Sequence, residues 1–169
     1  YCFEPSKVTY SFLNVNLSKI NKIQIFNYAL GNSNSYEKLS FPFWENNKSY
    51  RIHNLGLRSI YGNTDLVSEK IKVKKFDDTF SKEFFGSKSF YIKIDTEGYE
   101  LEVLKGMKNF IANANKLTIE LEFNDNVYKN ISADIVKEII IYLNKYNFKK
   151  YYFNKNKIIH INLKDIEKL

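Results

Sequence analysis

Two carboxylates, Asp95 and Glu97, directly follow an apolar segment at residues 90–94. Such a segment predicts a strand, and open α/β sheets bind their ligands at the carboxyl ends of strands. There the two carboxylates could position a substrate hydroxyl, act as a general base, or bind a divalent cation. They could equally serve only the N-terminus of the next helix, with Gly98 easing the turn. Capping does not require two carboxylates, so a functional role stands beside the structural one.

Three further glutamates occur at or near the ends of predicted strands. Glu4 follows the short apolar start of the chain, where nucleotide-binding α/β domains place an acid that accepts ribose hydrogen bonds. It could instead simply cap the helix that follows. Glu120 and Glu122 share one face of a strand predicted at 117–123, because side chains alternate along a strand. Glu122 could therefore lie near Asp95, whereas a solvent-facing role is favoured for Glu120.

The histidines and glycines of the chain give little further indication of a catalytic or nucleotide-binding site. His53 lies in an irregular segment with Arg58 and Tyr61, and the three could together meet a polar substrate. A single loop histidine is usually a surface residue, and His160 alternates with isoleucines as a structural strand residue would. The chain has no nucleophile elbow, no phosphate-cradling Gly-Lys-Ser/Thr loop and no G-x-G-x-x-G, so any nucleotide pocket lacks its usual glycine loop.

Strand and helix patterns alternate around these residues. Apolar periodicity predicts strands at 1–3, 22–29, 36–43, 70–75 (an edge strand), 90–94 and 117–123, and a hairpin at 151–154 and 157–163. Helices are predicted at 6–18 and 98–112 and after Ser132 as N-cap, with a short helical turn from Asp77. Residues 44–63 have no clean period, which is usual for a lid, a binding loop or a disordered insertion.

This order of elements predicts one α/β domain with a mostly parallel, doubly wound sheet, helices on both faces and a C-terminal antiparallel hairpin. No apolar run approaches the roughly 20 residues that a membrane helix needs. Cys2 is the single cysteine, so an internal disulfide and a cysteine-based zinc site are excluded, and a cytoplasmic location is expected.

The net charge of +7 raises the question of nucleic-acid binding. Only two of the 26 basic residues are arginines, although phosphate and base recognition usually depends on the arginine fork. The lysines are spread along the chain among many asparagines and isoleucines. We therefore do not expect nucleic acid as a partner.

Four ordered motifs carry a family resemblance. They are Phe3-Glu-Pro, Tyr28-Ala-Leu-Gly, Phe76-Asp-Asp and the block from Lys93 to Gly106. Together they resemble the FkbM family of S-adenosylmethionine-dependent methyltransferases over about positions 1–123. The resemblance implies a Rossmann-like methyltransferase fold and O-methylation of a sugar, a glycolipid or a similar hydroxylated molecule.

The resemblance also implies roles for particular residues. Glu4 would bind the cofactor ribose, Asp95 would face the sulfonium and the acceptor, and the adenine would be bordered by Tyr28, Ala29 and Leu30. The family's first strand and glycine-containing loop, about 30 residues by the size of a strand–helix–strand unit, are expected to precede Tyr1. Residues 1–169 are therefore interpreted as a single, incomplete methyltransferase domain that could be inactive alone.

In this interpretation Asp95 orients or deprotonates the acceptor hydroxyl, Glu97 assists, and His53 is a more distant candidate. No metal is assigned, although a cation-dependent enzyme would need Asp95, Glu97 and Glu122 to share one. The alternative is a non-catalytic glycan- or anion-binding module derived from the same fold. An incomplete sheet would expose a strand edge, which makes a homo-oligomer possible.

Overall fold

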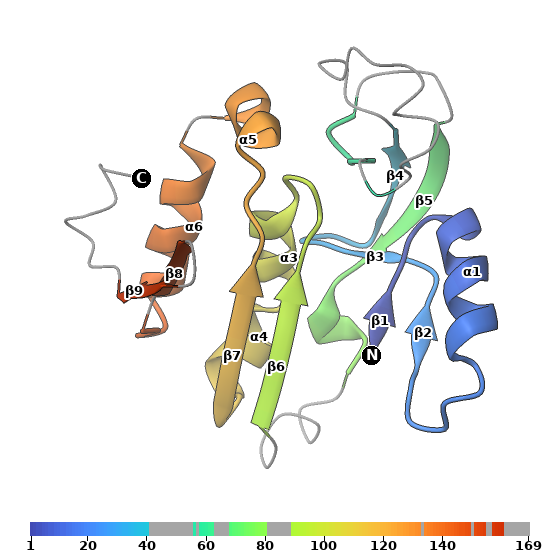
Figure 1. Cartoon of the computed structure of the whole chain (residues 1–169), viewed down its shortest axis with the longest axis horizontal. Coiled ribbons are helices and arrows are strands. Elements are labelled where there is room, and N and C mark those ends of the chain that lie inside the picture. Colours follow the sequence, from blue (N-terminus) through green and yellow to red (C-terminus); the bar gives the residue numbers. More distant parts are fainter. Residues whose placement is uncertain are drawn as a thin grey trace.

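A computed structural model of the chain describes residues 1–40, 56, 58–62, 68–80, 89–132, 134–149, 151–154 and 157–160 (Figure 1). The strands are β1 (Cys2–Phe3), β2 (Ile25–Phe26), β3 (Ala29–Leu30), β4 (Ser35–Leu39), β5 (Glu69–Lys74), β6 (Ser89–Ile94), β7 (Lys116–Leu121), β8 (Tyr151–Asn154) and β9 (Lys157–His160). The helices are α1 (Lys7–Leu17), α3 (Glu100–Gly106), α4 (Lys108–Asn113), α5 (Asp125–Ile131) and α6 (Ile135–Asn144), with a 3₁₀ turn, η2 (Phe76–Asp78).

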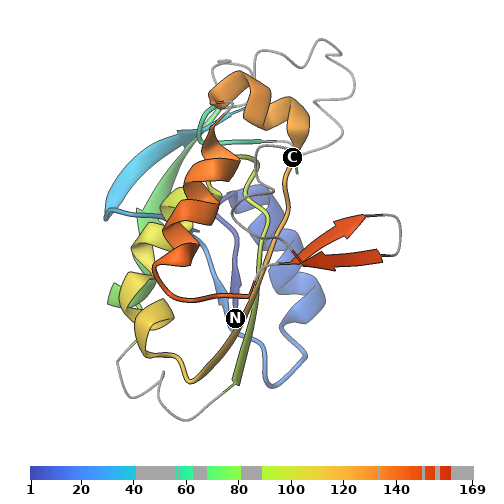
Figure 2. The same ribbon diagram turned by 90° about the vertical axis from the view of Figure 1, so that its left-hand side faces the viewer.

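Most strand pairs are parallel. β1 pairs with β2, β6 pairs with β7, and β3 pairs with β5, all in parallel, while β4 joins the other edge of β5 antiparallel. β8 and β9 form the predicted antiparallel hairpin. Figure 2 shows α1 on one side of the strands and α3, α4 and α6 on the other. The protein is therefore a mixed α/β fold, as the alternating sequence pattern predicts.

The principal core lies between the β6–β7 pair and the helices that follow it. Leu104 of α3, Phe110 of α4 and Ile139 of α6 are each 0% exposed and belong to one apolar cluster. Phe90 and Ile92 of β6 pack against that cluster, because alternate side chains of a strand face the same side. This packing sets the position of the loop that leaves β6.

The predicted strand at 22–29 is wrong as a single element. Phe26 pairs with β1, and Asn27 then donates hydrogen bonds from Nδ2 to the backbone oxygens of Glu4 (3.0 Å) and Pro5 (3.2 Å). The next strand, β3, pairs with β5 and not with β1. A period-two pattern does not reveal a change of partner strand.

Two other predicted elements need correction. β5 is the central strand of its three-stranded sheet, not an edge strand, and its Ile71 and Val73 are 2% and 0% exposed. The helix predicted at 98–112 is divided at Met107, since the Asp77 carboxylate accepts hydrogen bonds from the backbone N–H groups that begin α4. Helix α5 was not expected from the sequence. In the part of the chain that the structure describes, no helix could cross a membrane.

Two motif glycines, Gly31 and Gly106, meet in the folded chain. A Cβ atom on Gly106 would lie 1.9 Å from the carbonyl oxygen of Gly31 and 2.7 Å from its carbonyl carbon. Real Cβ atoms do not approach backbone so closely, so α3 can pack here only with glycine at its last position. The contact holds the last residue of α3 against the end of β3.

We expect Gly106→Ala to lower the free energy of unfolding by about 1–3 kcal/mol, because the added methyl overpacks against backbone. Chemical denaturation of the two proteins measures this difference. Lys108→Ala at the exposed start of α4 is the control, with an expected change of less than about 0.5 kcal/mol. Equal stability of the two variants would contradict the close approach.

Candidate functional site

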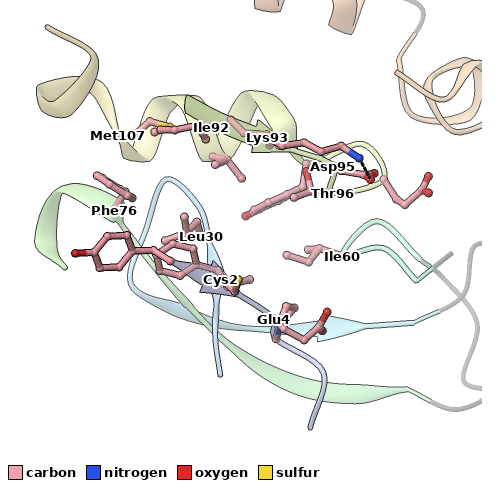
Figure 3. Close-up of a pocket in the computed structure, with 18 of the residues that line it drawn as sticks. Cys2, Glu4, Leu30, Ile60, Phe76, Ile92, Lys93, Asp95, Thr96 and Met107 are labelled. Atoms are coloured by element: carbon pink, nitrogen blue, oxygen red, sulfur yellow. Dashed lines mark hydrogen bonds and ion pairs between the residues drawn. The ribbon is translucent and has the colours of Figure 1, made fainter. Parts of the chain in front are cut away.

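A cleft of about 530 Å³ lies between β1 and β6 (Figure 3). β1 and β6 run in the same direction, so their carboxyl ends meet at one edge of the fold (Figure 1). Glu4 follows β1 on one wall and Asp95 follows β6 on the other, and both line the cleft. The structure thus brings together two acids that stand 91 positions apart in the sequence.

The interior of the cleft is apolar and its rim is acidic. Figure 3 shows the side chains that form the apolar part, which include Leu30, Ile60, Phe76, Ile92 and Met107. At the carboxyl ends of the strands, the lining includes the carboxylates of Glu4, Asp95 and Glu97. A ligand with an apolar ring system and several hydroxyl or cationic groups would match this division.

Glu4 both lines the cleft and supports the start of α1. Its Oε1 accepts a hydrogen bond from the Ser6 N–H at 2.7 Å, and the Ser6 hydroxyl caps α1 by accepting from the Thr9 N–H. Burial raises the pKa of Glu4, while the Ser6 N–H and the guanidinium of Arg58 oppose that rise. The N-cap of α1 is thus Ser6 and not Glu4, which supports the cap residue while lining the cleft.

Asp95 and Glu122 are joined by Lys93. The Lys93 ammonium lies 3.1 Å from Asp95 Oδ2 and 2.9 Å from Glu122 Oε2, on the exposed face of the β6–β7 pair. These ion pairs lower the pKa of Glu122 and raise that of Lys93. The expected approach of Glu122 to Asp95 is confirmed, with a cation between the two carboxylates.

Glu97 occupies a constrained position at the cleft. Its backbone φ is 51°, a left-handed conformation that few non-glycine residues adopt, and Gly98 follows at φ 103°. The Ser59 hydroxyl donates to the Glu97 carbonyl oxygen at 2.7 Å, and Asn124 Nδ2 donates to its carboxylate at 3.1 Å. Partial burial raises the pKa of Glu97. A strained backbone held by flanking side chains is common at functional sites.

Glu100, which was not predicted as a site residue, organises the loop that bears Asp95 and Glu97. Its side chain is 1% exposed, and its Oε1 accepts from the Thr96 N–H (2.9 Å), the Thr96 hydroxyl (3.0 Å) and the Gly98 N–H (3.2 Å). The Tyr128 hydroxyl of α5 donates to the other oxygen. A Thr-to-Glu spacing one residue wider than a capping box is the sequence signal that could have revealed it.

The remaining predicted site residues divide into three groups. Ala29 and Leu30 line the cleft, as an adenine-bordering position requires. Tyr28 does not line it; the ring is 9% exposed, packs beside Phe3 and Phe26, and lies under the ammonium of Lys74. His53 lies outside the described residues.

Among the described residues, no group of three or more His, Cys, Asp or Glu side chains is arranged to hold a metal ion. The geometry instead places the Lys93 ammonium between Asp95 and Glu122, two of the three side chains that a shared cation would need. The single ammonium thus offsets part of the charge of the two carboxylates.

Parallel strands, helices on both sides and an acidic rim above an apolar cleft define an α/β ligand-binding domain. The profile of the methyltransferase FkbM domain matches residues 1–150. The chain therefore belongs to the FkbM methyltransferase family, as its motifs indicate. No curated protein and no solved structure matches it. The matched region extends past β7 to include α5 and α6.

The opposite pKa shifts of Glu97 and Glu122 predict opposite effects on stability. Because the pKa of Glu97 is raised in the folded state, its ionisation opposes folding as pH rises through that pKa. Glu97→Gln should therefore unfold at a higher temperature than the parent protein at pH 7, and this advantage should shrink toward pH 3. Thermal unfolding at the two pH values measures it.

Glu122→Gln provides the matched comparison with the reverse sign. The folded-state pKa of Glu122 is lowered, so its contribution is present at pH 7 and disappears as pH falls through that pKa. This variant should be less stable than the parent at pH 7 and approach it at acidic pH. Shifts of the same sign in both variants would contradict the two assigned environments.

Proposed function

We propose that this protein is an S-adenosylmethionine-dependent methyltransferase that methylates a hydroxyl group of a sugar, a glycan or a similar small molecule. Membership of the FkbM family supports methyl transfer, and the position of Asp95 at the mouth of the cleft carries the rest of the proposal. There the Asp95 carboxylate could accept a hydrogen bond from an acceptor hydroxyl in the cleft.

The residues of the cleft fit such a cofactor. The apolar wall at Ala29 and Leu30 suits an adenine ring, and the carboxylate of Glu4 suits ribose hydroxyls. When bound, the cofactor supplies an electrophilic methyl group on a sulfonium centre.

Side chains of this protein would then orient the acceptor hydroxyl and take up the proton that it loses. Asp95 accepts a hydrogen bond from the acceptor hydroxyl and takes up the proton that the oxygen loses. The Lys93 ammonium pairs with both the Asp95 and the Glu122 carboxylate and so orients them. Glu97, two residues further along the same loop, could accept a second hydrogen bond from the methyl acceptor. The assisting role of His53 stays a prediction. Positioning of this kind supplies much of the acceleration in a group transfer.

We also propose that the strand pairs of this chain are parts of one doubly wound sheet. β1 and β6 border the cleft, and neither has a second strand partner among the described residues. A parallel strand seated between them would pair with both edges and join the two strand pairs into one doubly wound sheet. A glycine-containing loop after such a strand would complete the cofactor site.

Titration calorimetry with S-adenosylhomocysteine tests the cofactor assignment. We expect saturable binding by the longest polypeptide that the gene encodes, and weaker or no binding by the 169-residue chain if a further strand completes the cleft. Glu4→Gln should weaken binding at least about tenfold, because hydrogen bonds to charged groups contribute about 1.5–3 kcal/mol. Glu37→Gln, outside the cleft, is the control. No binding by a folded full-length protein would favour the non-catalytic module.

Asp95→Ala tests the assigned base. In the polypeptide that binds cofactor, we expect turnover to fall by about 10²–10⁴-fold. Affinity for S-adenosylhomocysteine should change little, since this product lacks the sulfonium charge. The assay follows transfer of labelled methyl groups to a panel of methyl glycosides. The control is Glu120→Ala, which changes a carboxylate of the neighbouring strand β7 outside the cleft. Equal activity of the two variants would remove Asp95 from the chemistry.

A further inference from the structure

A short segment, residues 58–61, connects the two walls of the cleft. On the side of β1, the guanidinium of Arg58 donates a hydrogen bond to the hydroxyl of Ser6, the N-cap of α1. On the side of β6, the hydroxyl of Ser59 donates to the carbonyl oxygen of Glu97 at 2.7 Å. The segment is therefore tied to the chain that follows each of the two strands bordering the cleft.

The position of Ser59 is itself fixed by backbone hydrogen bonds. Its N–H donates to the Ser40 carbonyl oxygen at 2.9 Å, and its carbonyl oxygen accepts from the Ser40 N–H at 3.1 Å. Ser59 is 1% exposed, and its hydroxyl oxygen accepts from the Tyr61 N–H at 3.1 Å. Because a serine hydroxyl has a single proton, donation to Glu97 uses its whole donor capacity. Ser59 thus acts on Glu97 from a fixed position.

Glu97 depends on such support because its backbone is left-handed. A residue with a side chain is unfavourable at φ 51°, and it persists there only where the surrounding structure holds it. Ser59 holds the carbonyl group, and Asn124 Nδ2 holds the carboxylate at 3.1 Å. Backbone conformation sets the direction in which a side chain leaves the chain. The Ser59 hydrogen bond therefore helps to decide how Glu97 lines the cleft.

The carboxylate of Glu97 is unfavourable to the fold in a second way. Burial raises its pKa, the Asn124 amide opposes that rise, and the charge of Asp95 adds to it. Ionisation of Glu97 at neutral pH therefore opposes folding. A glycine would adopt this φ without strain and would carry no charge. A glutamate that brings both strain and an unfavourable charge to the cleft is explained by what it binds and not by stability.

We propose that Ser59 is a positioning residue for methyl transfer, which holds Glu97 so that its carboxylate binds a second hydrogen-bond donor of the methyl acceptor. This inference rests on the proposed function and deepens it, because it assigns different groups of the acceptor to the two carboxylates. Asp95 receives the reacting hydroxyl, and Glu97 binds a neighbouring hydroxyl or N–H group that is not methylated. Ser59 then affects how tightly the acceptor binds, and it does not affect how tightly the cofactor binds.

Steady-state kinetics of the longest polypeptide that the gene encodes test the role of Ser59, with the panel of methyl glycosides as acceptors. In Ser59→Ala we expect the KM for the acceptor to rise about three- to tenfold, because a hydrogen bond that positions Glu97 is lost. A change in KM alone indicates lost binding and not lost chemistry, so kcat should stay within about twofold of the parent value. The dissociation constant of S-adenosylhomocysteine should also stay within about twofold.

Ser40→Ala is the matched control, because it makes the same change at the other residue of the bridge. Ser40 is 0% exposed, and its hydroxyl has no hydrogen-bond partner in the part of the chain that the structure describes. We expect the acceptor KM of this variant to stay within about twofold of the parent value. If Ser59→Ala does not fold, Ser59→Cys replaces it, since a thiol fills the same site and is only a weak donor.

A double-mutant cycle separates positioning of Glu97 from a merely structural role of Ser59. In Glu97→Gly the carboxylate is absent and the left-handed backbone is unstrained, so the acceptor KM should rise. Adding Ser59→Ala to this variant should change the KM by less than about twofold, since the carboxylate that Ser59 positions is already absent.

Two results would overturn this inference while the parent protein still transfers methyl groups. One is an equal acceptor KM in Ser59→Ala and Ser40→Ala, and the other is a Ser59→Ala effect of the same size with and without the Glu97 side chain. A folded full-length protein that binds no S-adenosylhomocysteine and transfers no methyl group would overturn the proposed function as well.

Discussion

The buried carboxylate of Glu100 is the interaction on which the candidate site depends. It lies in the first turn of α3 and accepts hydrogen bonds from Thr96 and Gly98, so the loop leaving β6 folds around it. Tyr128 brings α5 into the same network. Buried charges persist only where several donors satisfy them, so this network joins strand, loop and two helices into one unit. The carboxylates at the cleft are held in place by an acid that does not line it.

A second constraint links that unit to the other half of the fold. The Gly31–Gly106 contact places the end of β3 against the end of α3, and the ring of Tyr99 also lies close to Gly31. The wall that carries Ala29 and Leu30 is therefore held at a set distance from the wall that carries Asp95. The cleft has its form because two halves of the chain meet at a pair of glycines. Two of the family motifs are thus, in part, two sides of one packing contact.

Much of the fold could be predicted from the sequence, because local patterns report local structure. The N-cap at Ser6, the hairpin at 151–160 and the strand that precedes Asp95 all depend on periodicity or on one capping side chain. The division of 22–29 into two strands, and the central place of β5, depend on which strands pair. The role of Glu100 could not be predicted, because a glutamate in the first turn of a helix is common and only the structure shows that this one is buried.

The sequence by itself determined the elements, the motifs and the family, because these reside in residue types and spacings along the chain. It also placed acids at the ends of strands, which is a local fact. Tertiary structure alone decided that Glu4 and Asp95 face one cleft, that Lys93 pairs with both Asp95 and Glu122, and that Tyr28 packs outside the cleft. The physical reason is that each of these facts depends on the pairing and packing of segments distant in sequence, which no local periodicity encodes.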